Sequence, residues 1–218
     1  MFTGLVQQIG TILSLERDSK GATIHVGCSF PELVLGESIA THGICLTVIR
    51  DSGRGFYAEA SEETLVKSVL GDLRVNERVH LERALGATDK LGGHLVTGHV
   101  DGVGRIVERI PLGDAVRMIV EVPSELAPFL APKGSITIDG VSLTVNGATG
   151  NRFDVALVPF TRKETVFDAL PVGARVNLEV DILAKYVARL LGRPGVDGVP
   201  PGGSGGVTLD LLRKHGYA

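Results

Sequence analysis

Ser38 to Val48 reads SIATHGICLTV, and 97 residues later Ser135 to Val145 reads SITIDGVSLTV. Two further pairs of segments repeat in the same order: LRVNERVHLE from Leu73 with LPVGARVNLE from Leu170, and TGLVQQIGTI from Thr3 with TGHVDGVGRI from Thr97. A repeat that keeps the order of its segments indicates that a whole folding unit was duplicated. Each copy spans roughly 90 residues, enough for a small domain with its own core. The sequence therefore predicts two similar domains in tandem.

The composition fits two ordinary globular domains. Of the 218 residues, 44% are hydrophobic and 22% are charged, which is typical of folded chains rather than disordered ones. The formal net charge of −3 gives no electrostatic reason to expect nucleic acid or an anionic membrane as a partner, so we expect a small molecule or a protein. No apolar run is long enough to cross a bilayer.

Cysteine usage favours a cytoplasmic protein. Cys28 and Cys45 are the two cysteines, they form no CxxC pair, and no signal peptide pattern opens the chain. We therefore expect neither secretion nor a disulfide scaffold.

Short strands dominate the expected secondary structure. Segments rich in Val, Ile, Leu and Thr and separated by glycines predict strands at Ile39–Arg50, Val75–Glu82, Ile136–Asn146, Phe153–Val158 and Arg175–Val180. Short helices are expected at Ser61–Leu70, at Ser124–Leu130 and after Phe160, with Ser61 or Thr161 as caps. About six strands per copy predict an all-β fold of two six-stranded antiparallel Greek-key barrels in tandem, because closure removes exposed strand edges.

The C-terminal region has a different pattern. Ile182 to Leu191 places Leu183, Tyr186, Val187 and Leu190 on one helical face, which we expect to pack on its own barrel or on the same helix of other subunits. The Gly/Pro-rich stretch after it predicts a linker followed by a short tail. The expected domains are 1–93, 94–184, a helix at 185–192 beginning near 182, and the linker and tail at 193–218.

Four matched positions differ between the copies in chemically meaningful ways. They are Cys45 against Ser142, His42 against Asp139, Leu5 against His99, and Ala84 against Asp181. The surrounding Gly, Leu, Thr and Val residues are shared. A shared scaffold with local divergence suggests two related pockets with different tasks.

The chain closely resembles the α-type riboflavin synthase family. The resemblance rests on MFTGLVQ, GICLTV, LGGHLVTGHVDG, KGSITIDG with DGVSLTV, and VNLEVDILAKYVARLL, in this order over nearly the whole chain. It implies that each barrel binds one 6,7-dimethyl-8-ribityllumazine and that one lumazine passes a four-carbon unit to the other, giving riboflavin and 5-amino-6-ribitylaminouracil. It also implies a homotrimer held by the C-terminal helix, with the working site between barrels of two subunits. Lumazine synthase is a possible further partner.

The reaction implied by the resemblance requires neither metal nor nucleotide cofactor. His94 and His99 are five residues apart, which does not suit two ligands on one helical face, and the cysteines lack partner spacing. The sequence also contains no GxGxxG segment between a strand and a helix and no GxxxxGKS loop. We therefore expect no cofactor.

The divergent residues are the first catalytic candidates. Cys45 is expected to add to ring carbon 7 of the acceptor lumazine or to position that addition, against the alternative of a small buried hydrophobic residue. His99 is expected to move a proton at the 7-methyl group of the donor, against a purely orienting hydrogen bond. Ser142, Thr144 and Asp181 are candidates to share proton transfer, although Asp181 also suits a helix N-cap. Ser38 lies near the reacting centre in the family, or is an ordinary serine at a strand start.

Substrate-binding residues follow from the resemblance, position by position. The N-terminal pocket would use Gly4, Leu5, Val6, Cys45, Leu46, Thr47, Glu59, Ala60, Ser61, Glu62, Glu63 and Thr64. The C-terminal pocket would use Gly98, His99, Val100, Lys133, Ser142, Leu143, Thr144, Leu157, Val158, Pro159, Phe160, Thr161 and Arg162.

Two departures from the family pattern and two other protein classes stay open. His42 stands where the family commonly has Asn, and Phe160 stands within PFT where many members read PHT or PET. A non-catalytic lumazine- or flavin-binding relative would store the chromophore. A purely structural double barrel would act through its C-terminal helix.

Overall fold

The computed structural model describes residues 1–192 and Arg213. Met1–Ile182 form one compact unit that contains both repeats, and a second unit begins at Leu183. The expected linker and tail at 193–218 lie, apart from Arg213, outside the described residues.

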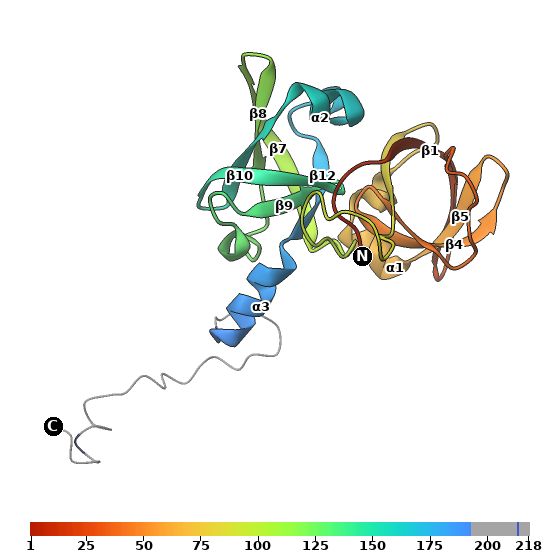
Figure 1. The fold of residues 1–218 in the computed structure, drawn as a ribbon, viewed down its shortest axis with the longest axis horizontal. Helices are drawn as coiled ribbons and strands as arrows, with labels where there is room; N and C mark the ends of the chain where they lie inside the picture. Colours follow the sequence, from red (N-terminus) through yellow and green to blue (C-terminus); the bar gives the residue numbers. More distant parts are fainter. Residues whose placement is uncertain (193–212, 214–218) are drawn as a thin grey trace. The chain divides into compact units, whose positions relative to one another are not determined.

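The first repeat forms a closed six-stranded antiparallel barrel. Its strands are β1 (Gln8–Asp18), β2 (Gly21–Gly27), β3 (Ser38–Thr41), β4 (Ile44–Asp51), β5 (Gly55–Ser61) and β6 (Arg78–Arg83), in the spatial order β1-β2-β5-β4-β3-β6. Figure 1 shows this barrel in red to orange. Closure pairs every strand on both edges, so the small sheet has no open edge.

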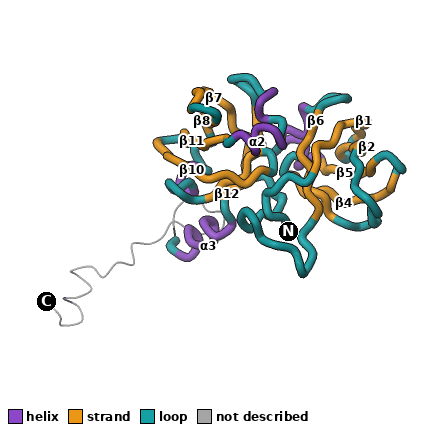
Figure 2. The backbone as a smooth tube through the Cα atoms, turned by 45° about the horizontal axis from the view of Figure 1, so that its top comes forward, coloured by secondary structure: helices purple, strands orange, loops and turns teal. Residues whose placement is uncertain are grey.

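The second repeat forms a barrel of the same kind. Its strands are β7 (Gly102–Leu112), β8 (Ala115–Glu121), β9 (Ser135–Ile138), β10 (Val141–Thr149), β11 (Arg152–Leu157) and β12 (Arg175–Val180), in the order β10-β11-β8-β7-β12-β9. Strands, orange in Figure 2, make up most of both repeats. The expected fold class of two tandem six-stranded antiparallel barrels is confirmed.

Each quoted repeat segment is a tight hairpin rather than one long strand. The predicted strand Ile39–Arg50 is interrupted at His42 and Gly43, whose φ angles are 51° and 80°. The predicted strand Ile136–Asn146 is interrupted in the same way at Asp139 and Gly140, at 46° and 82°. Two consecutive residues with positive φ form the type of turn that joins twisted antiparallel strands. The sequence prediction was therefore wrong in joining β3 to β4 and β9 to β10.

The barrel cores take alternate residues of each strand. Along β4, Ile44, Leu46 and Val48 are buried in the first core, whereas Cys45 is partly exposed and Thr47 is exposed. The second barrel repeats this pattern with a buried Leu143 between the less buried Ser142 and Thr144 on β10. Successive side chains of a strand point to opposite faces, so Cys45 and Ser142 lie on the outside of their barrels.

The short helices agree in part with expectation. Ser61 caps α1 (Glu62–Lys67), with its side chain accepting from the Thr64 N–H, and the 3-10 helix η1 (Val69–Asp72) follows. In the second repeat α2 (Pro159–Glu164) is followed by η3 (Phe167–Ala169). Thr161 does not cap α2, because proline already occupies the first helical position and begins the helix at residue 159.

The two other predicted helices have shorter or different bounds. Only Ala127–Phe129 within the predicted Ser124–Leu130 segment is helical, as the 3-10 helix η2. The C-terminal helix α3 spans Ile182–Leu190.

Candidate functional site

A small cavity lies beside Cys45 on the outer face of the first barrel. Its volume is ≈ 210 Å³. Its lining comes from β4, from α1 and the residue after it, and from the loop before β7: Ile44, Cys45, Glu63, Thr64, Lys67, Ser68, Gly98, His99 and Val100. We call this cavity the Cys45 pocket. The structure therefore brings the two main catalytic candidates, Cys45 and His99, to one pocket.

The loop that carries His99 comes from the second repeat and binds the pocket strand of the first. The Cys45 N–H donates to the Gly98 carbonyl oxygen at 2.8 Å. Gly98 has a φ of 78°, and a Cβ added there would lie 2.7 Å from Cys45 Cβ. Only glycine allows this close approach without strain.

A buried carboxylate fixes this loop to its own barrel. Glu179 on β12 accepts hydrogen bonds from the Thr97 N–H at 2.6 Å, the Thr97 hydroxyl at 2.7 Å and the Gly98 N–H at 2.9 Å. The Thr97 Oγ1 in turn accepts from the His99 N–H at 3.3 Å. These bonds fix the backbone position from which the His99 side chain projects.

The same arrangement recurs with the repeats exchanged. Ser142 on β10 donates its N–H to the Gly4 carbonyl oxygen at 2.8 Å. Glu82 on β6 accepts from the Thr3 N–H at 2.6 Å, the Thr3 hydroxyl at 2.7 Å and the Gly4 N–H at 3.0 Å. We call the surroundings of Ser142 the Ser142 site. Burial is the largest influence on Glu82 and raises its carboxyl pKa, against the lowering effect of these donors.

The grouping of residues expected from the sequence is therefore exchanged. Gly4 lies at Ser142, and Val6 packs against the second core. Gly98 and His99 lie at Cys45, and Val100 packs against the first core. The cause is that the two loops that contain Thr3-Gly4 and Thr97-Gly98, here called the TG loops, cross between the barrels. Each TG loop contacts the strand that carries Ser142 or Cys45 in the other barrel.

Sequence reasoning missed His94 as a neighbour of Ser142. The two side chains are joined by a hydrogen bond of 2.7 Å between His94 Nδ1 and Ser142 Oγ, and His94 Nε2 lies 3.3 Å from Thr137 Oγ1. Burial lowers the pKa of His94, while Asp181 acts in the opposite direction. From the sequence, His94 is considered only as a metal ligand, and that role is rejected. His94 and Ser142 are 48 positions apart, so no local sequence pattern links them.

Sequence reasoning also missed Lys67 and Ser68 in the Cys45 pocket. Lys67 forms an ion pair of 2.7 Å with Glu63 one helical turn away, and this pair lowers the pKa of Glu63. The periodicity of α1 was the signal that could have placed Lys67 beside the predicted Glu63 and Thr64.

Several other predicted residues are placed around these two sites. Leu46 and Leu143 are buried in the cores, so the backbone is the part they present outward. Ser38 pairs with Thr47 across β3 and β4, two residues along the strand from Cys45. Asp181 is the residue between β12 and α3. This position fits both of its expected roles, as a site residue and as a helix N-cap.

The predicted substrate-binding stretches 59–64 and 157–162 occupy matching positions, at the start of α1 and of α2. Glu59, Ala60 and Ser61 line a separate cavity of ≈ 310 Å³, together with residues of the β1–β2 turn and the start of β2. In the second repeat Phe160 is 74% exposed, while Arg162 forms an ion pair of 3.0 Å with Asp168. Arg162 and Arg109 lower the pKa of Asp168.

Lys133 bonds to β10 three residues along the strand from Ser142. Its N–H donates to the Val145 carbonyl oxygen at 2.7 Å, near the bulge of β10. Its side-chain charge lowers the pKa of Asp154, after the larger effect of Arg117.

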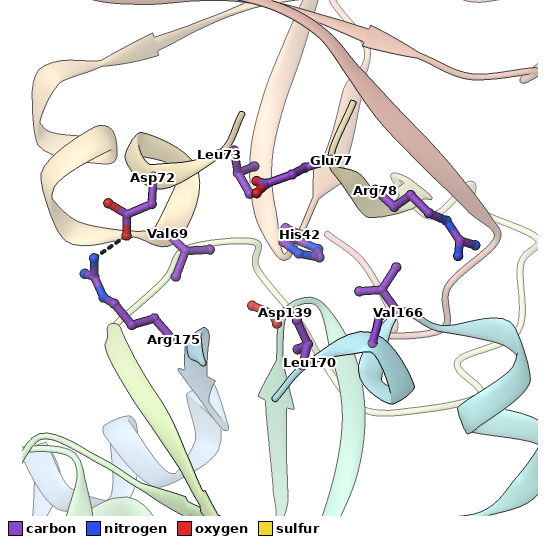
Figure 3. Close-up of a pocket in the computed structure, with 11 residues that line it drawn as sticks. His42, Val69, Asp72, Leu73, Glu77, Arg78, Asp139, Val166, Leu170 and Arg175 are labelled. Carbon is purple, nitrogen blue, oxygen red and sulfur yellow. Dashed lines mark hydrogen bonds and ion pairs between the residues drawn. The ribbon is translucent and has the colours of Figure 1, made fainter. Parts of the chain in front are cut away.

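A larger cavity of ≈ 450 Å³ lies between the barrels, away from the catalytic candidates. Figure 3 shows the two hairpin-turn residues His42 and Asp139 on it, with Val69 and Val166 on opposite sides. Burial raises the pKa of Asp139 to about 8 and lowers the pKa of His42 well below its ordinary value. The departure His42 thus belongs to the contact between barrels.

Within residues 1–192 and Arg213, no cluster of three His, Cys, Asp or Glu side chains could hold a metal ion. Among the helices in the same part of the chain, none has the length and apolar character needed to span a membrane.

Comparison with known proteins identifies the family. The lumazine binding domain model matches residues 3–84 and again 97–181. Riboflavin synthase of Photobacterium phosphoreum is 39% identical over 220 residues, covering 100% of this chain and 99% of the relative. Riboflavin synthase of Brucella abortus is 43% identical over 197 residues, covering 87% and 98%. The chain belongs to the riboflavin synthase family.

The riboflavin synthase fold also has solved counterparts. A structure of LumP complexed with riboflavin superimposes with a TM-score of 0.77 at 22% identity, covering 83% of this chain and 99% of LumP. At this identity the likeness concerns the fold.

Proposed function

We propose that the protein is a riboflavin synthase that converts two molecules of 6,7-dimethyl-8-ribityllumazine into riboflavin and 5-amino-6-ribitylaminouracil. Full-length similarity to named riboflavin synthases supports this function. The structural observation that carries it is the pair of pseudo-equivalent sites with different chemistry, Cys45 with His99 in one and Ser142 with His94 in the other. Two identical substrates with opposite roles as donor and acceptor require two such unequal sites.

The catalytic roles follow from this grouping. We propose that Cys45 adds to carbon 7 of the acceptor lumazine or positions that addition. His99 lines the same pocket within one chain, so we assign its proton transfer to the lumazine bound beside Cys45 rather than to a partner in the other pocket. His94 and Ser142, joined at 2.7 Å, are then the groups placed to exchange a proton at the second lumazine.

The remaining assignments stand as proposals of the same function. Substrate contacts are proposed for Thr47, Thr64 and Thr144 among the residues named from the sequence. Ser38, Thr144 and Asp181 are proposed as further catalytic residues. The proposed domain limits are 1–93 and 94–184 for the two lumazine-binding barrels; the trimerisation helix expected at 185–192 corresponds to α3, which begins at Ile182 and ends at Leu190. We further propose a cytoplasmic protein, with lumazine synthase as a physical partner.

The direct test is to incubate the purified protein with 6,7-dimethyl-8-ribityllumazine alone and to follow riboflavin by absorbance and chromatography. One riboflavin for every two lumazines is the expected result. Tight binding without turnover would instead identify a non-catalytic lumazine-binding relative, the main alternative. No binding would leave only the double-barrel fold.

Variants of the Cys45 pocket test the catalytic roles. Cys45→Ala and His99→Ala should each lower kcat by about 100-fold or more, the usual effect of removing a nucleophile or a proton-transfer group. Cys28→Ala is the matched control, because Cys28 is the other free, half-buried cysteine and lies outside this pocket. A Cys45→Ala enzyme that retains most of its turnover would remove the nucleophile assignment.

A trimer held by α3 is proposed from the apolar face of that helix. Tyr186 is 62% exposed and Leu190 is 85% exposed in the single chain, and a contiguous exposed apolar face marks an interaction site. Light scattering should give the mass of three chains for the natural protein and of one chain for Tyr186→Glu with Leu190→Glu. Leu112→Glu, at a position on β7 that is 59% exposed, should leave the trimer intact. A monomeric natural protein would contradict the proposal.

A further inference from the structure

Two buried polar side chains cross between the barrels at the same position of the repeat. His80 lies on β6 and Asn177 on β12, and they are 2% and 1% exposed. Each leaves its own barrel and bonds backbone groups of the other. We call this pair the inter-barrel clasp.

His80 bonds two backbone groups of the second repeat. Its Nε2 accepts from the Val166 N–H at 2.9 Å, and its Nδ1 lies 2.8 Å from the Asp139 carbonyl oxygen. A peptide N–H can only donate and a carbonyl can only accept, so the ring must be neutral with its proton on Nδ1. His80 thereby offers one donor and one acceptor, as a carboxamide does.

Asn177 makes the reciprocal pair of bonds to the first repeat. Its Oδ1 accepts from the Val69 N–H at 2.8 Å, and its Nδ2 donates to the His42 carbonyl oxygen at 2.9 Å. Val69 and Val166 are equivalent residues of the repeat, and so are His42 and Asp139. The clasp is therefore symmetric in its partners although its two side chains differ chemically.

The bonded N–H groups belong to equivalent segments of the two repeats, of which the first borders the Cys45 pocket. Val69 comes two residues after α1, whose Glu63, Thr64 and Lys67 line the Cys45 pocket. Val166 comes two residues after α2, the equivalent helix of the second repeat. Each barrel thus holds the end of the helix that belongs to the other barrel.

The cavity of Figure 3 makes these hydrogen bonds important. Val69 and Val166 both line it, while the residues that follow them, Leu70 and Phe167, are packed in the first and second cores. A buried N–H that loses its acceptor is costly, because water inside the interface replaces the acceptor poorly. The bonds from the opposite barrel fix the Val69 and Val166 N–H groups at this cavity, beside the core contacts of Leu70 and Phe167.

We infer that His80 and Asn177 are positioning residues for the lumazine reaction, each holding from one barrel the helix that borders the substrate site of the other. This inference rests on the proposed function for its link to catalysis. It predicts a crossed pattern: a change in the first barrel affects the site of the second, and the reverse.

Amide hydrogen exchange of the full-length protein tests the crossing without any ligand, so its outcome is independent of the proposed function. His80→Leu should speed exchange in peptides covering 159–166 by about tenfold, with 62–69 nearly unchanged. Asn177→Leu, nearly isosteric, should show the opposite pattern. Equal changes in both segments, or a change confined to the mutated barrel, would overturn the inference.

Rescue and ligand protection separate positioning from general destabilisation. His80→Asn restores one donor and one acceptor, as Asn177 uses them, and should return exchange at 159–166 to within about threefold of the natural rate even if His80→Leu folds poorly.

In a Cys28→Ser background, the 6,7-dimethyl-8-ribityllumazine concentration that half-protects Cys45 from iodoacetamide reports the Cys45 pocket. Combining Cys45→Ser with Ser142→Cys moves the reporter thiol to the Ser142 site.

The crossed pattern should appear in these protection measurements as well. Asn177→Leu should raise the half-protecting concentration at Cys45 by about tenfold and leave that of the reporter thiol at the Ser142 site within about twofold, and His80→Leu should do the reverse. An uncrossed pattern at both reporters would refute the positioning role. If neither reporter is protected by the lumazine while exchange is crossed, the proposed function fails and the clasp stands.

Discussion

At the scale of single residues, glycine decides how closely the two repeats approach. Gly43 and Gly140 stand in the two hairpin turns, and a Cβ on either would lie within 2.7 Å of the backbone nitrogen of the other. Gly98 does the same for the loop that carries His99. The repeated glycines of the sequence thus serve contacts between the copies as well as turns within them.

Gly98→Ala tests this close approach. The added methyl would lie 2.7 Å from Cys45 Cβ at a φ of 78°, so we expect a loss of about 2–4 kcal/mol in the free energy of unfolding and weaker lumazine binding. Gly53→Ala is the control, because Gly53 has a similar φ of 72° with nothing within 4 Å of its Cβ. Its loss, measured by urea denaturation, should be about 1–2 kcal/mol. Equal losses would show that the contact with Cys45 is unimportant.

At the scale of elements, a short helix lines the Cys45 pocket, and an equivalent helix follows β11 in the second repeat. α1 has six residues, too few to be stable by itself, so its position depends on its cap and on its neighbours. Ser61 supplies the cap through a 3.2 Å hydrogen bond from the Thr64 N–H, whereas Val158 at the start of α2 has no such bond. The two helices therefore begin by different means.

Ser61→Ala should cost about 1 kcal/mol of stability, because the first turn of α1 loses its capping oxygen. Val158→Ser places a capping hydroxyl at the equivalent position of α2 and should not destabilise the protein. Thermal unfolding of both variants checks the pair. A Ser61→Ala protein as stable as the natural one would show that tertiary contacts alone hold α1.

At the scale of the whole molecule, the contact between barrels contains titratable groups that are kept neutral. Burial lowers the pKa of His80 to about 4 from an ordinary 6.5, and burial raises the pKa of Asp139 to about 8 from an ordinary 3.8. The pKa of His42 is also lowered, mainly by burial and also by His80. Neutral groups suit this interface, because the bonds to Val166 and Asp139 require an uncharged His80 ring.

These shifts predict a stability maximum near pH 6.5, the ordinary pKa of the two histidines. Below that pH the unfolded chain protonates both histidines while the folded chain does not, so stability falls as pH decreases toward about 4. Asp139 acts in the opposite direction: up to about pH 8 the folded chain retains the Asp139 proton that the unfolded chain has lost, and the two histidines outweigh this effect only below pH 6.5. Stability therefore falls again as pH rises, by up to about 1.4 kcal/mol per pH unit.

Urea denaturation between about pH 5 and pH 9 measures this dependence on both sides of the expected maximum. Asp139→Asn keeps an acceptor for the Asn177 N–H and cannot ionise, so its stability should not fall as pH rises toward about 8. If the variant retains the slope of the natural protein, another group causes it.

The sequence by itself determined the duplication, the barrel class and the residues with chemical capacity. A repeat of this length fixes two equivalent folds, and alternation of apolar residues fixes which face of β4 and β10 is buried, because side chains in a strand alternate with a period of two. Cys45 and His99 were found because the other copy carries Ser142 and Leu5 in their places.

Only the tertiary structure decided which of these residues meet. The crossed TG loops place His99 beside Cys45 rather than beside Ser142, and they bring His94 to Ser142. The clasp of His80 and Asn177 was equally hidden, since its four backbone partners lie on the opposite repeat. The physical reason is that local patterns specify a barrel, whereas the pairing of two barrels depends on hydrogen bonds and close contacts between residues far apart in the chain.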